Sequence, residues 1–265
     1  MRALRILREE VAAIACEDTR QTQKLLDHYG IRKRLVSYHD HNETSRAGEL
    51  IDQMERGESI ALVSDAGTPL VSDPGYRVVT AAIEKGILVV PIPGASAVLA
   101  GLAAAGLPTD EFRFIGFLPA KSGARRKALE TLLDERGTVV AYESPHRILD
   151  TLAAMAELFG TRRVVVAREL TKIHEEFLRG TASEVRAELA KRASVKGEIT
   201  ILIEKSPETT TITEPLEEIA RLQREQGMER MDAIKAVAKQ LGLPKREVYR
   251  LAAAEDSNSP GKRRG

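Results

Sequence analysis

The sequence predicts an α/β protein that consists of two α/β domains and a small C-terminal helical appendage. Short apolar runs of strand length, such as Ile60–Val63, alternate with amphipathic helical patterns. Most of these runs lead into loops rich in Asp, Gly, Pro and Ser, as expected at the ends of strands in a layered α/β fold. After Pro207 the composition changes to a Thr-rich stretch, which is followed by helical patterns alone.

The first domain is expected at 1–111, as four strand–helix repeats after an opening helix. A run such as Ile60–Val63, apolar throughout, suits a strand buried on both faces of a parallel sheet. Asp18 matches the N-cap of the helix that ends at His28 or Tyr29, and Gly30 suits its C-terminal end. The expected strands are 12–16, 35–38, 60–63 and 87–91, and the expected helices are 2–11, 19–29, 44–56, 76–85 and 97–106.

The second domain is expected at 112–206, with a sheet of mixed strand directions. The run Arg125, Arg126 and Lys127 is expected on a solvated helix face, since such runs are more often surface than phosphate site. A linker at 207–213, a helical appendage at 214–256 and a disordered tail at 257–265 follow. The expected strands are 114–117, 138–142, 164–167, 176–179 and 197–204, and the expected helices are 122–135 and 148–159.

Composition excludes several classes of protein. The net charge of +1 gives no global field that would recruit nucleic acid, although a local patch can still do so. The single cysteine, Cys16, cannot form an intrachain disulfide and fits a reducing cytosol. No apolar run approaches the roughly 18 residues of a membrane span, and the N-terminus has no signal-peptide core. The chain is therefore expected to be cytoplasmic.

The stretch from Ser64 to Gly75 is the most informative loop. In parallel sheets, ligands bind outside the carboxyl ends of the strands, which is where this loop begins. Gly67 permits a close approach to a ligand, while the loop's prolines stiffen the chain. It has no phosphate-binding GxxxxGK[ST] pattern. A plain strand-to-helix connection is the alternative. The loop from Pro93 to Ala97 leads into a helix of small residues, whose first backbone N–H groups are free donors.

Titratable residues follow two other strands. Glu17, Asp18 and Arg20 come after the first strand, and for Asp18 a helix cap alone is the competing explanation. His39 and His41 flank Asp40 and suggest a metal site. However, residues at i and i+2 alternate faces on a strand and no further His or Cys is near in sequence, so no metal is expected.

The C-terminal segment offers a different function. Ala238, Gly242 and Val248 have the spacing of a helix-turn-helix corner. A DNA-reading domain would carry Lys245, Arg246 and Arg250 on its second helix. A helical appendage packed on its own chain or on a partner is the alternative.

Six motifs in order identify a family resemblance. Together they resemble the tetrapyrrole-methylase-like class of S-adenosylmethionine-dependent methyltransferases. Within that class they are most similar to the bacterial 16S rRNA (cytidine-2′-O)-methyltransferase I family, which methylates a ribose 2′-hydroxyl in small-subunit ribosomal RNA. The motifs are ACEDTR (Ala15–Arg20), SYHDHN (Ser37–Asn42), SDAGTPLVSDPG (Ser64–Gly75), PIPGASA (Pro91–Ala97), YESPHR (Tyr142–Arg147) and ARELTKIHEE (Ala167–Glu176).

The resemblance implies that S-adenosylmethionine binds in a cleft between the two α/β domains of a homodimeric enzyme. It also implies that small-subunit rRNA, within the assembled 30S subunit, is the partner. Backbone groups and small side chains of these loops suit such a ligand. The cofactor-binding residues expected on this basis are Ser64, Asp65, Ala66, Gly67, Thr68, Val71, Pro93, Gly94, Ser96, Ala97, Glu143 and Leu170.

Methyl transfer from a sulfonium needs alignment above all, and a base helps only if it reaches the ribose hydroxyl. The candidate bases are Glu17, Asp18, His39 and Glu175, which the sequence does not rank, and the candidate positioning residues are Arg20 and Lys172. Arg20, His39, Arg147 and Lys172 are expected to line a basic approach to the cleft. A tetrapyrrole or another small acceptor is the second hypothesis for the substrate, and DNA binding is the third.

The sequence departs from the family at one point. Family members begin with a strand and a Pro/Gly loop ahead of the helix that starts here at Met1, and a misassigned start codon or a truncation would account for the difference. That strand would lie centrally in the first sheet. Without it the edges of two neighbouring strands are expected to be exposed.

Overall fold

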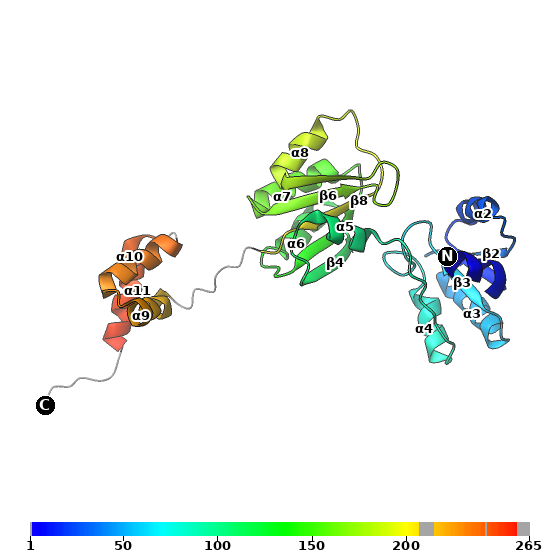
Figure 1. Ribbon diagram of the computed structural model, residues 1–265, viewed down its shortest axis with the longest axis horizontal. Coiled ribbons are helices and arrows are strands. Elements are labelled where there is room, and N and C mark those ends of the chain that lie inside the picture. The colour runs from blue at the N-terminus through cyan, green and yellow to red at the C-terminus, as the bar shows by residue number, and fades with distance from the viewer. Residues whose placement is uncertain (1, 207–214, 242, 259–265) are drawn as a thin grey trace. The chain divides into compact units, whose positions relative to one another are not determined.

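The computed structural model describes residues 2–206, 215–241 and 243–258, and the side chains of these except 247 and 253–258. The chain divides into two compact units, Met1–Lys205 and Ser206–Gly265, which are described separately (Figure 1). The first unit holds two sheets and the second holds helices. The expected linker at 207–213 lies outside the described residues.

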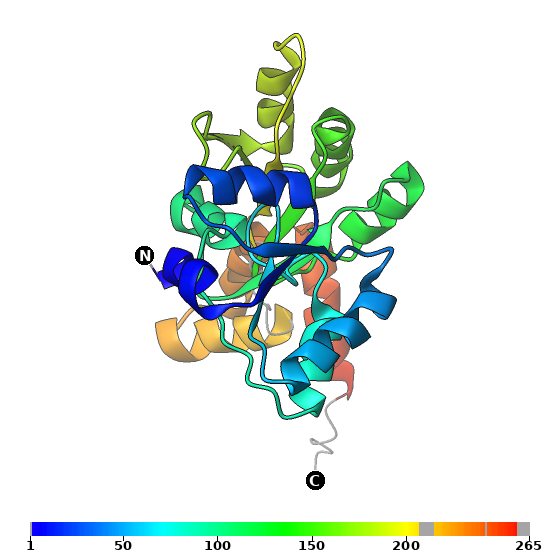
Figure 2. The ribbon, with the colours of Figure 1, turned by 90° about the vertical axis from the view of Figure 1, so that its right-hand side faces the viewer.

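The first sheet is parallel and has the order β2-β1-β3, with β1 (Ala13–Cys16), β2 (Arg34–Ser37) and β3 (Ile60–Val63). The central strand is buried along its whole length, and Ile14 and Ala15 face opposite layers. Figure 2 shows these layers on the two sides of the sheet. The helices are α1 (Arg2–Arg5), the π-helical turn η1 (Ile6–Glu10), α2 (Thr19–His28), α3 (Glu43–Glu55) and α4 (Tyr76–Glu84).

The two layers follow from the sequence pattern. Ile14 packs with Val11, Leu26 and Ile31, beneath α2. On the other face, Ala15 belongs to a cluster built from apolar residues of α3 and α4, which recur at helical spacing. These clusters pack the sheet between the helices. Because the three strands are parallel, the loops that follow them emerge at one edge.

The expected strand at 87–91 is wrong. These residues are extended but form no ladder, and no backbone–backbone hydrogen bond in the described part of the chain involves Leu88, Val89 or Val90. Leu88 is 84% exposed. A strand is stable only where a neighbour takes its backbone hydrogen bonds, and this segment has no neighbour. The first domain therefore shows three strand–helix repeats, not four.

The burial expected for Ile60–Val63 is also corrected. All four residues of β3 are half-buried, because β3 is an edge strand that pairs with β1 alone among the described residues. The strand buried on both faces is β1. An apolar run alone did not distinguish the centre of the sheet from its edge.

The second sheet has the order β4-β5-β8-β6-β7 and mixed directions, as predicted. Only β4 and β5 pair in parallel, and the other pairs are antiparallel. The strands are β4 (Phe112–Phe117), β5 (Thr138–Glu143), β6 (Arg163–Arg168), β7 (Glu176–Thr181) and β8 (Ile199–Ile203). The helices are α6 (Ser122–Glu130), α7 (Ile148–Phe159) and α8 (Ala182–Ala190), the last of which the sequence analysis did not anticipate.

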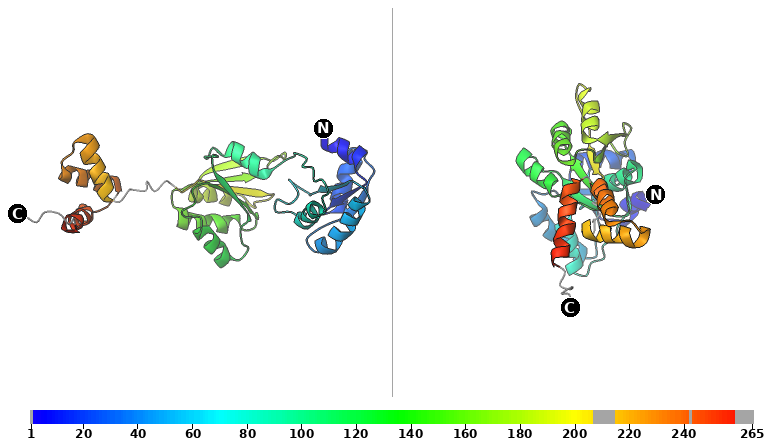
Figure 3. Two further views of the ribbon diagram at one scale, coloured as in Figure 1. Left: turned by 90° about the horizontal axis from the view of Figure 1, so that it is seen from below. Right: turned by 90° about the vertical axis from the view of Figure 1, so that its left-hand side faces the viewer.

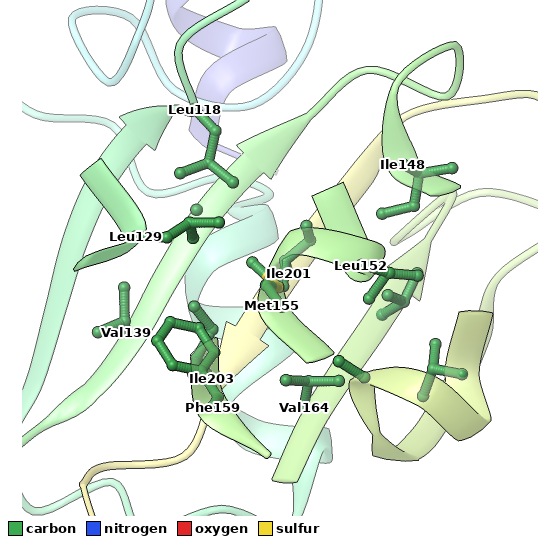
Figure 4. Close-up of a cluster of buried hydrophobic side chains, with 14 of the residues drawn as sticks. Leu118, Leu129, Val139, Ile148, Leu152, Met155, Phe159, Val164, Ile201 and Ile203 are labelled. Atoms are coloured by element: carbon green, nitrogen blue, oxygen red, sulfur yellow. The ribbon is translucent and has the colours of Figure 1, made fainter. Parts of the chain in front are cut away.

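The main core lies between this sheet and these helices. Figure 4 shows Leu152, Met155 and Phe159 of α7 against Val164 and Ile201 of the sheet. The opposite face is covered by α5 (Ala97–Ala105), whose Val98 and Leu102 meet side chains of β5, β6 and β8 (Figure 3, left). The helix that precedes the expected boundary at 111 thus packs on the second sheet.

The basic run on α6 is only partly solvated. Arg125 is buried, and its Nη1 donates to the carbonyls of Pro119 and Ala120. Arg126 pairs with Glu157 and Glu130 on the surface, and Lys127 is exposed. The expectation of a solvated face is therefore wrong for Arg125, which anchors the turn before its own helix.

The second unit contains α9 (Pro215–Gln226), α10 (Arg230–Leu241) and α11 (Lys245–Asn258), which share a small apolar core (Figure 3, right). Ala238 and Val248 are buried at the α10–α11 corner, as the helix-turn-helix spacing predicts, while Gly242 lies outside the described residues. The tail expected from 257 begins one residue before the end of α11, and 259–265 are outside the described residues. In the part of the chain that is described, no helix has the length and apolarity needed to cross a membrane.

Glu176 provides a test of this fold. Hydrogen bonds from Arg192, together with those from Arg168, lower the pKa of Glu176 to about 2. A depressed pKa stabilises the folded state above the ordinary value of 4.5, and that contribution is lost as the pH falls towards about 2. We expect Glu176→Gln to lower the free energy of unfolding at pH 7 by about 1–3 kcal/mol.

Urea denaturation between pH 3 and 7 measures this effect. The difference between the wild type and Glu176→Gln should shrink as the pH is lowered. Glu188→Gln is the matched control, because Glu188 is half exposed and pairs only with Lys191. An equal loss in both variants, or a difference independent of pH, would contradict the role assigned to Glu176.

Candidate active site

The loops that follow β1, β2 and β3 emerge at the same edge of the first sheet. The ladder pairs Cys16 with Ser37 and with Val63, so the three strands end level with one another. Glu17, Tyr38 and Ser64 are the first residues beyond these ends. The sequence-predicted residues of the first domain that come directly after strands are therefore brought together.

Asp18 serves as the N-cap of α2, as predicted. Its Oδ1 accepts from the backbone N–H of Arg20 at 2.8 Å, and the Arg20 guanidinium binds both carboxylate oxygens. These hydrogen bonds lower the pKa of Asp18 to about 2. The Arg20 side chain is 86% exposed, so the pair lies at the surface. An acid so strongly held in its ionised form is a poor proton acceptor.

The backbone N–H and one ring nitrogen of His39 both contact Asn42. Its N–H donates to Asn42 Oδ1 at 2.9 Å, and its Nε2 lies 3.3 Å from Asn42 Nδ2. Nδ1 is buried without a hydrogen-bond partner among the described residues. The rings of His39 and His41 have centroids 5.9 Å apart, and within the described ranges no group of three His, Cys, Asp or Glu side chains could hold a metal ion.

The loop from Ser64 to Gly75 has a strained backbone. Leu70 and Ser72 have φ values of 72° and 65°, which side-chain-bearing residues rarely adopt. A Cβ at Gly75, where φ is 142°, would lie 2.7 Å from side-chain carbons of Leu62 and Leu70. Strain of this kind persists only where surrounding contacts impose it, and it is concentrated at functional sites.

Glu43 supplies those contacts, and the sequence analysis did not single it out. Its Oε1 accepts from the hydroxyl of Tyr38 at 3.0 Å and from the backbone N–H groups of Gly75 at 3.1 Å and Arg77 at 3.3 Å. One carboxylate thus connects the end of β2 to the end of the strained loop. An acid in the first turn of a helix is common, so nothing in the sequence indicates a partner more than 30 residues away.

Four carboxylates lie near one another at this edge. They belong to Glu17, Asp40, Asp65 and Asp73, which come from the three loops. Partial loss of solvent around the carboxylate, followed by repulsion from Asp65, Asp73 and Asp40, raises the pKa of Glu17, which is exposed at the surface. Burial and then Asp65, Asp40 and Glu198 raise that of Asp73, against a hydrogen bond from Ser64. The edge is therefore a region of negative potential.

The loop also reaches the ends of strands in the second sheet. A Cβ at Gly116 of β4 would lie 3.4 Å from Ser72 Oγ. Tyr142, at the end of β5, has a pKa raised by burial and then by the charges of Asp73 and Glu198. Thr68 Oγ1 donates to the carbonyl of Ala95 at 3.3 Å. Residues of three expected motifs, SDAGTPLVSDPG, PIPGASA and YESPHR, thus contact or influence one another around this loop.

The segment around Ala95 is open. Pro93 and Gly94 are exposed in the extended chain that leads to α5. Ser96 is the N-cap of that helix, and its Oγ accepts from the backbone N–H of Leu99 at 3.4 Å. Ala97 opens the helix and is half-buried. The carbonyls of Ala95 and Ser96 accept from Thr68 Oγ1 and Ala100 N–H, whereas no backbone–backbone hydrogen bond in the described part of the chain involves Pro93 or Gly94, whose backbone groups can meet a ligand.

The candidates in the second sheet are engaged with their own surroundings. Glu143 is buried, and its carboxylate accepts from Ser144 N–H, Arg147 and Thr151. Its side chain is thus committed, and only its backbone is left for a cofactor. Leu170 is buried in the cluster beneath α5.

The loop after β6 is also held together by its own residues. Glu175 accepts from the backbone N–H of Thr171 at 2.7 Å. Lys172 pairs with Glu169 at 3.2 Å and with Glu198 at 3.1 Å. Burial alone would lower the pKa of Lys172, but these partners raise it. Lys172 is therefore fully charged and partly neutralised by its neighbours.

An open hollow of about 540 Å³ lies beside α2. Thr19, Arg20, Gln23, Lys24, Asp27 and Leu35 line it. Of these, only Arg20 was predicted as a site residue. The strained backbone, the clustered carboxylates and the unpartnered His39 nitrogen are all elsewhere, so this hollow is not the candidate site.

The sequence and the fold of this chain are similar to those of known proteins. A sequence model of the tetrapyrrole (corrin/porphyrin) methylases matches residues 1–186. Among solved structures, cobalt precorrin-4 methyltransferase is similar with a TM-score of 0.55 at 15% identity, covering 77% of this chain and 87% of that one. Diphthine synthase has a TM-score of 0.54 at 16% identity, with 77% and 83% covered. At these identities the structures establish the fold alone.

Two sequence relatives are much closer to this chain. A protein of Halalkalibacterium halodurans named ribosomal RNA small subunit methyltransferase I is 47% identical over 256 residues, which cover 94% of this chain and 88% of the relative. The protein of the same name from Bacillus subtilis is 43% identical over 252 residues, with 91% and 85% covered. The chain therefore belongs to the tetrapyrrole (corrin/porphyrin) methylase family, in the group formed with these relatives.

Proposed function

We propose that the protein is an S-adenosylmethionine-dependent methyltransferase that methylates the ribose 2′-hydroxyl of a cytidine in small-subunit (16S) ribosomal RNA. The observation that carries the proposal is the meeting of three loops at one sheet edge, with a strained backbone and four carboxylates. Two relatives that align with most of the chain are named as small-subunit rRNA methyltransferases, which supports the substrate class.

The residues present fit S-adenosylmethionine. The ligand carries a sulfonium and an ammonium group. The carboxylate cluster, in which Glu17 and Asp73 have raised pKa values, favours a cation nearby. Exposed Ala66, Gly67 and Thr68 offer backbone groups without bulk. The other residues proposed for binding are Ser64, Asp65, Val71, Pro93, Gly94, Ser96 and Ala97, the backbone of Glu143, and Leu170 as an apolar wall.

Glu17 is the candidate base that the geometry favours. Asp18 is tied to Arg20, and Glu175 accepts from Thr171, whereas Glu17 is exposed and has a raised pKa. When bound, S-adenosylmethionine would supply an electrophilic methyl group, with its sulfur as a neutral leaving group. Glu17 accepts the hydroxyl proton, and alignment of the ribose provides most of the acceleration.

The basic approach proposed from Arg20, His39, Arg147 and Lys172 is partly neutralised. Arg20 pairs with Asp18, Arg147 with Glu143, and Lys172 with Glu169 and Glu198. In this role the three cations position substrate groups while remaining bound to their acids. Most of the affinity for phosphate must then come from other cations of the chain.

We also propose that the enzyme is a cytoplasmic homodimer that acts on the assembled 30S subunit. A tetrapyrrole acceptor is the second candidate, because cobalt precorrin-4 methyltransferase shares the fold. The acceptor assay below discriminates between the two candidates.

Transfer of a labelled methyl group tests the function. We expect label to enter the 16S rRNA of undermodified small subunits, at the 2′-hydroxyl of one cytidine, and not to enter a tetrapyrrole precursor. Glu17→Gln should lose about 10²-fold or more in rate at saturating cofactor, where a weaker affinity for the cofactor does not limit the reaction. Label in the tetrapyrrole alone, or in neither acceptor, would refute the rRNA proposal.

The carboxylate cluster predicts how cofactor binding depends on pH. Glu17 and Asp73 have raised pKa values, so each is partly protonated at pH values where an ordinary carboxyl is ionised. A bound cation favours the ionised forms, and affinity should therefore rise with pH. Calorimetry from pH 5 to 7 should show the Kd of S-adenosylmethionine falling several-fold. S-adenosylhomocysteine, whose sulfur is neutral, is the control and should change less; equal changes would exclude this electrostatic role.

Glu43 is proposed to position the cofactor loop. We expect Glu43→Ala to weaken cofactor binding by about 5- to 100-fold, since two backbone N–H groups lose a charged acceptor. Glu43→Gln, which keeps one acceptor oxygen, should restore part of the affinity. Glu49→Ala on the same helix is the control, because Glu49 is half exposed and pairs only with Arg46. If thermal stability fell with unchanged cofactor affinity, Glu43 would be structural only.

A further inference from the structure

A group of exposed cations, Lys239, Lys245, Arg246 and Arg250, defines what is called here the α10–α11 surface. None of the four takes part in an ion pair or side-chain hydrogen bond within the described ranges, and all are exposed. Two other cations of this unit are paired with acids. Arg221 of α9 pairs with Glu218 and Glu225, and Lys235 pairs with Asp232.

Packing fixes the direction of these side chains. Val248 and Ala252 of α11 are buried against the other helices, so the residues between them face outward. Arg246 and Arg250 are four residues apart and share one face of the helix. At the corner, Leu243 N–H donates to the carbonyl of Ala238 and Val248 N–H donates to that of Pro244. The cations are therefore presented by a fixed corner between two helices.

The local charge is strongly positive in a chain whose net charge is only +1. Residues 239–250 contain four basic residues and one acidic residue, Glu247. Lys245 and Arg246 also stand in the first turn of α11, where free backbone N–H groups add partial positive charge. The partial positive charge at the start of α11 repels the side chains of Lys245 and Arg246. An anion bound there would reduce this repulsion.

RNA matches this surface better than other anionic partners. Tyr249 lies between the two arginines in sequence and is 52% exposed, so it offers a ring on which an unpaired base can stack. Near the candidate active site, Arg20, Arg147 and Lys172 are already paired with acids. We infer that the α10–α11 surface binds the phosphate backbone of the RNA substrate. This inference rests on the proposed rRNA methyltransferase function.

The test compares the full-length wild type with Lys245→Ala/Arg246→Ala/Arg250→Ala in filter binding to purified 16S rRNA over a range of KCl concentrations. We expect the Kd to rise by about 10-fold or more, and the slope of log K against log[salt] to become shallower by about 2. In the methyl-transfer assay, KM for RNA should rise while kcat and the cofactor Kd stay unchanged.

Two further variants keep the result interpretable. Arg221→Ala/Arg224→Ala/Lys235→Ala removes the same charge from the same unit and should bind RNA almost as the wild type does. Lys245→Arg/Arg246→Lys/Arg250→Lys keeps the charge and should restore binding. Circular dichroism checks that the helices of each variant are formed.

The outcomes separate this inference from the function on which it rests. If the wild type transfers methyl groups to rRNA but the triple alanine variant equals its control, the α10–α11 surface does not bind RNA. Weaker binding to assembled subunits with unchanged binding to purified rRNA would identify a ribosomal protein as the partner and overturn the inference. If the wild type neither binds nor methylates rRNA, both the function and the inference fail.

Discussion

The pairing of β1 with β2 and β3 is the constraint on which the rest of the first sheet depends. In a parallel ladder all three strands point the same way, so their following loops must share one edge. The apolar clusters on both faces keep the register, since a slip of one residue would move Ile14 and Ala15 into the wrong layers. Glu17, the residues after Tyr38 and the Ser64–Gly75 loop meet for this reason alone.

That meeting brings like charges together, and the protein tolerates the repulsion through specific contacts. The pKa values of Glu17 and Asp73 are raised by desolvation and then by neighbouring carboxylates, which oppose their ionisation. Glu43, in contrast, has several donors, and despite its burial its pKa is lowered. One carboxylate thus stabilises the backbone of the strained loop, while others remain available to a cationic ligand. Which of these roles a carboxylate has depends on the hydrogen-bond donors around it, and not on its residue type.

Much of this arrangement could be predicted from the sequence. The strand Ile60–Val63 and the cap at Asp18 follow from local patterns, and the structure confirms both. The segment 87–91 has the same apolar character as β3 but is not a strand, because strand formation needs a neighbour that local sequence does not specify. The roles of Glu43 and Arg125 were missed for a related reason. The tertiary structure determines the hydrogen-bond partners of Glu43 and Arg125, and the sequence at either position does not indicate them.

The distribution of charge explains how a nearly neutral chain could serve an anionic substrate. The loops at the first sheet are rich in carboxylates, which favour a cationic cofactor and would repel RNA phosphates at close range. Cations placed beside those carboxylates pair with acids, as Arg20 and Lys172 do, and so lose strength as phosphate sites. Among the described residues, the four cations of the α10–α11 surface take part in no ion pair, so a phosphate backbone would meet less opposition there than at the paired cations of the loops.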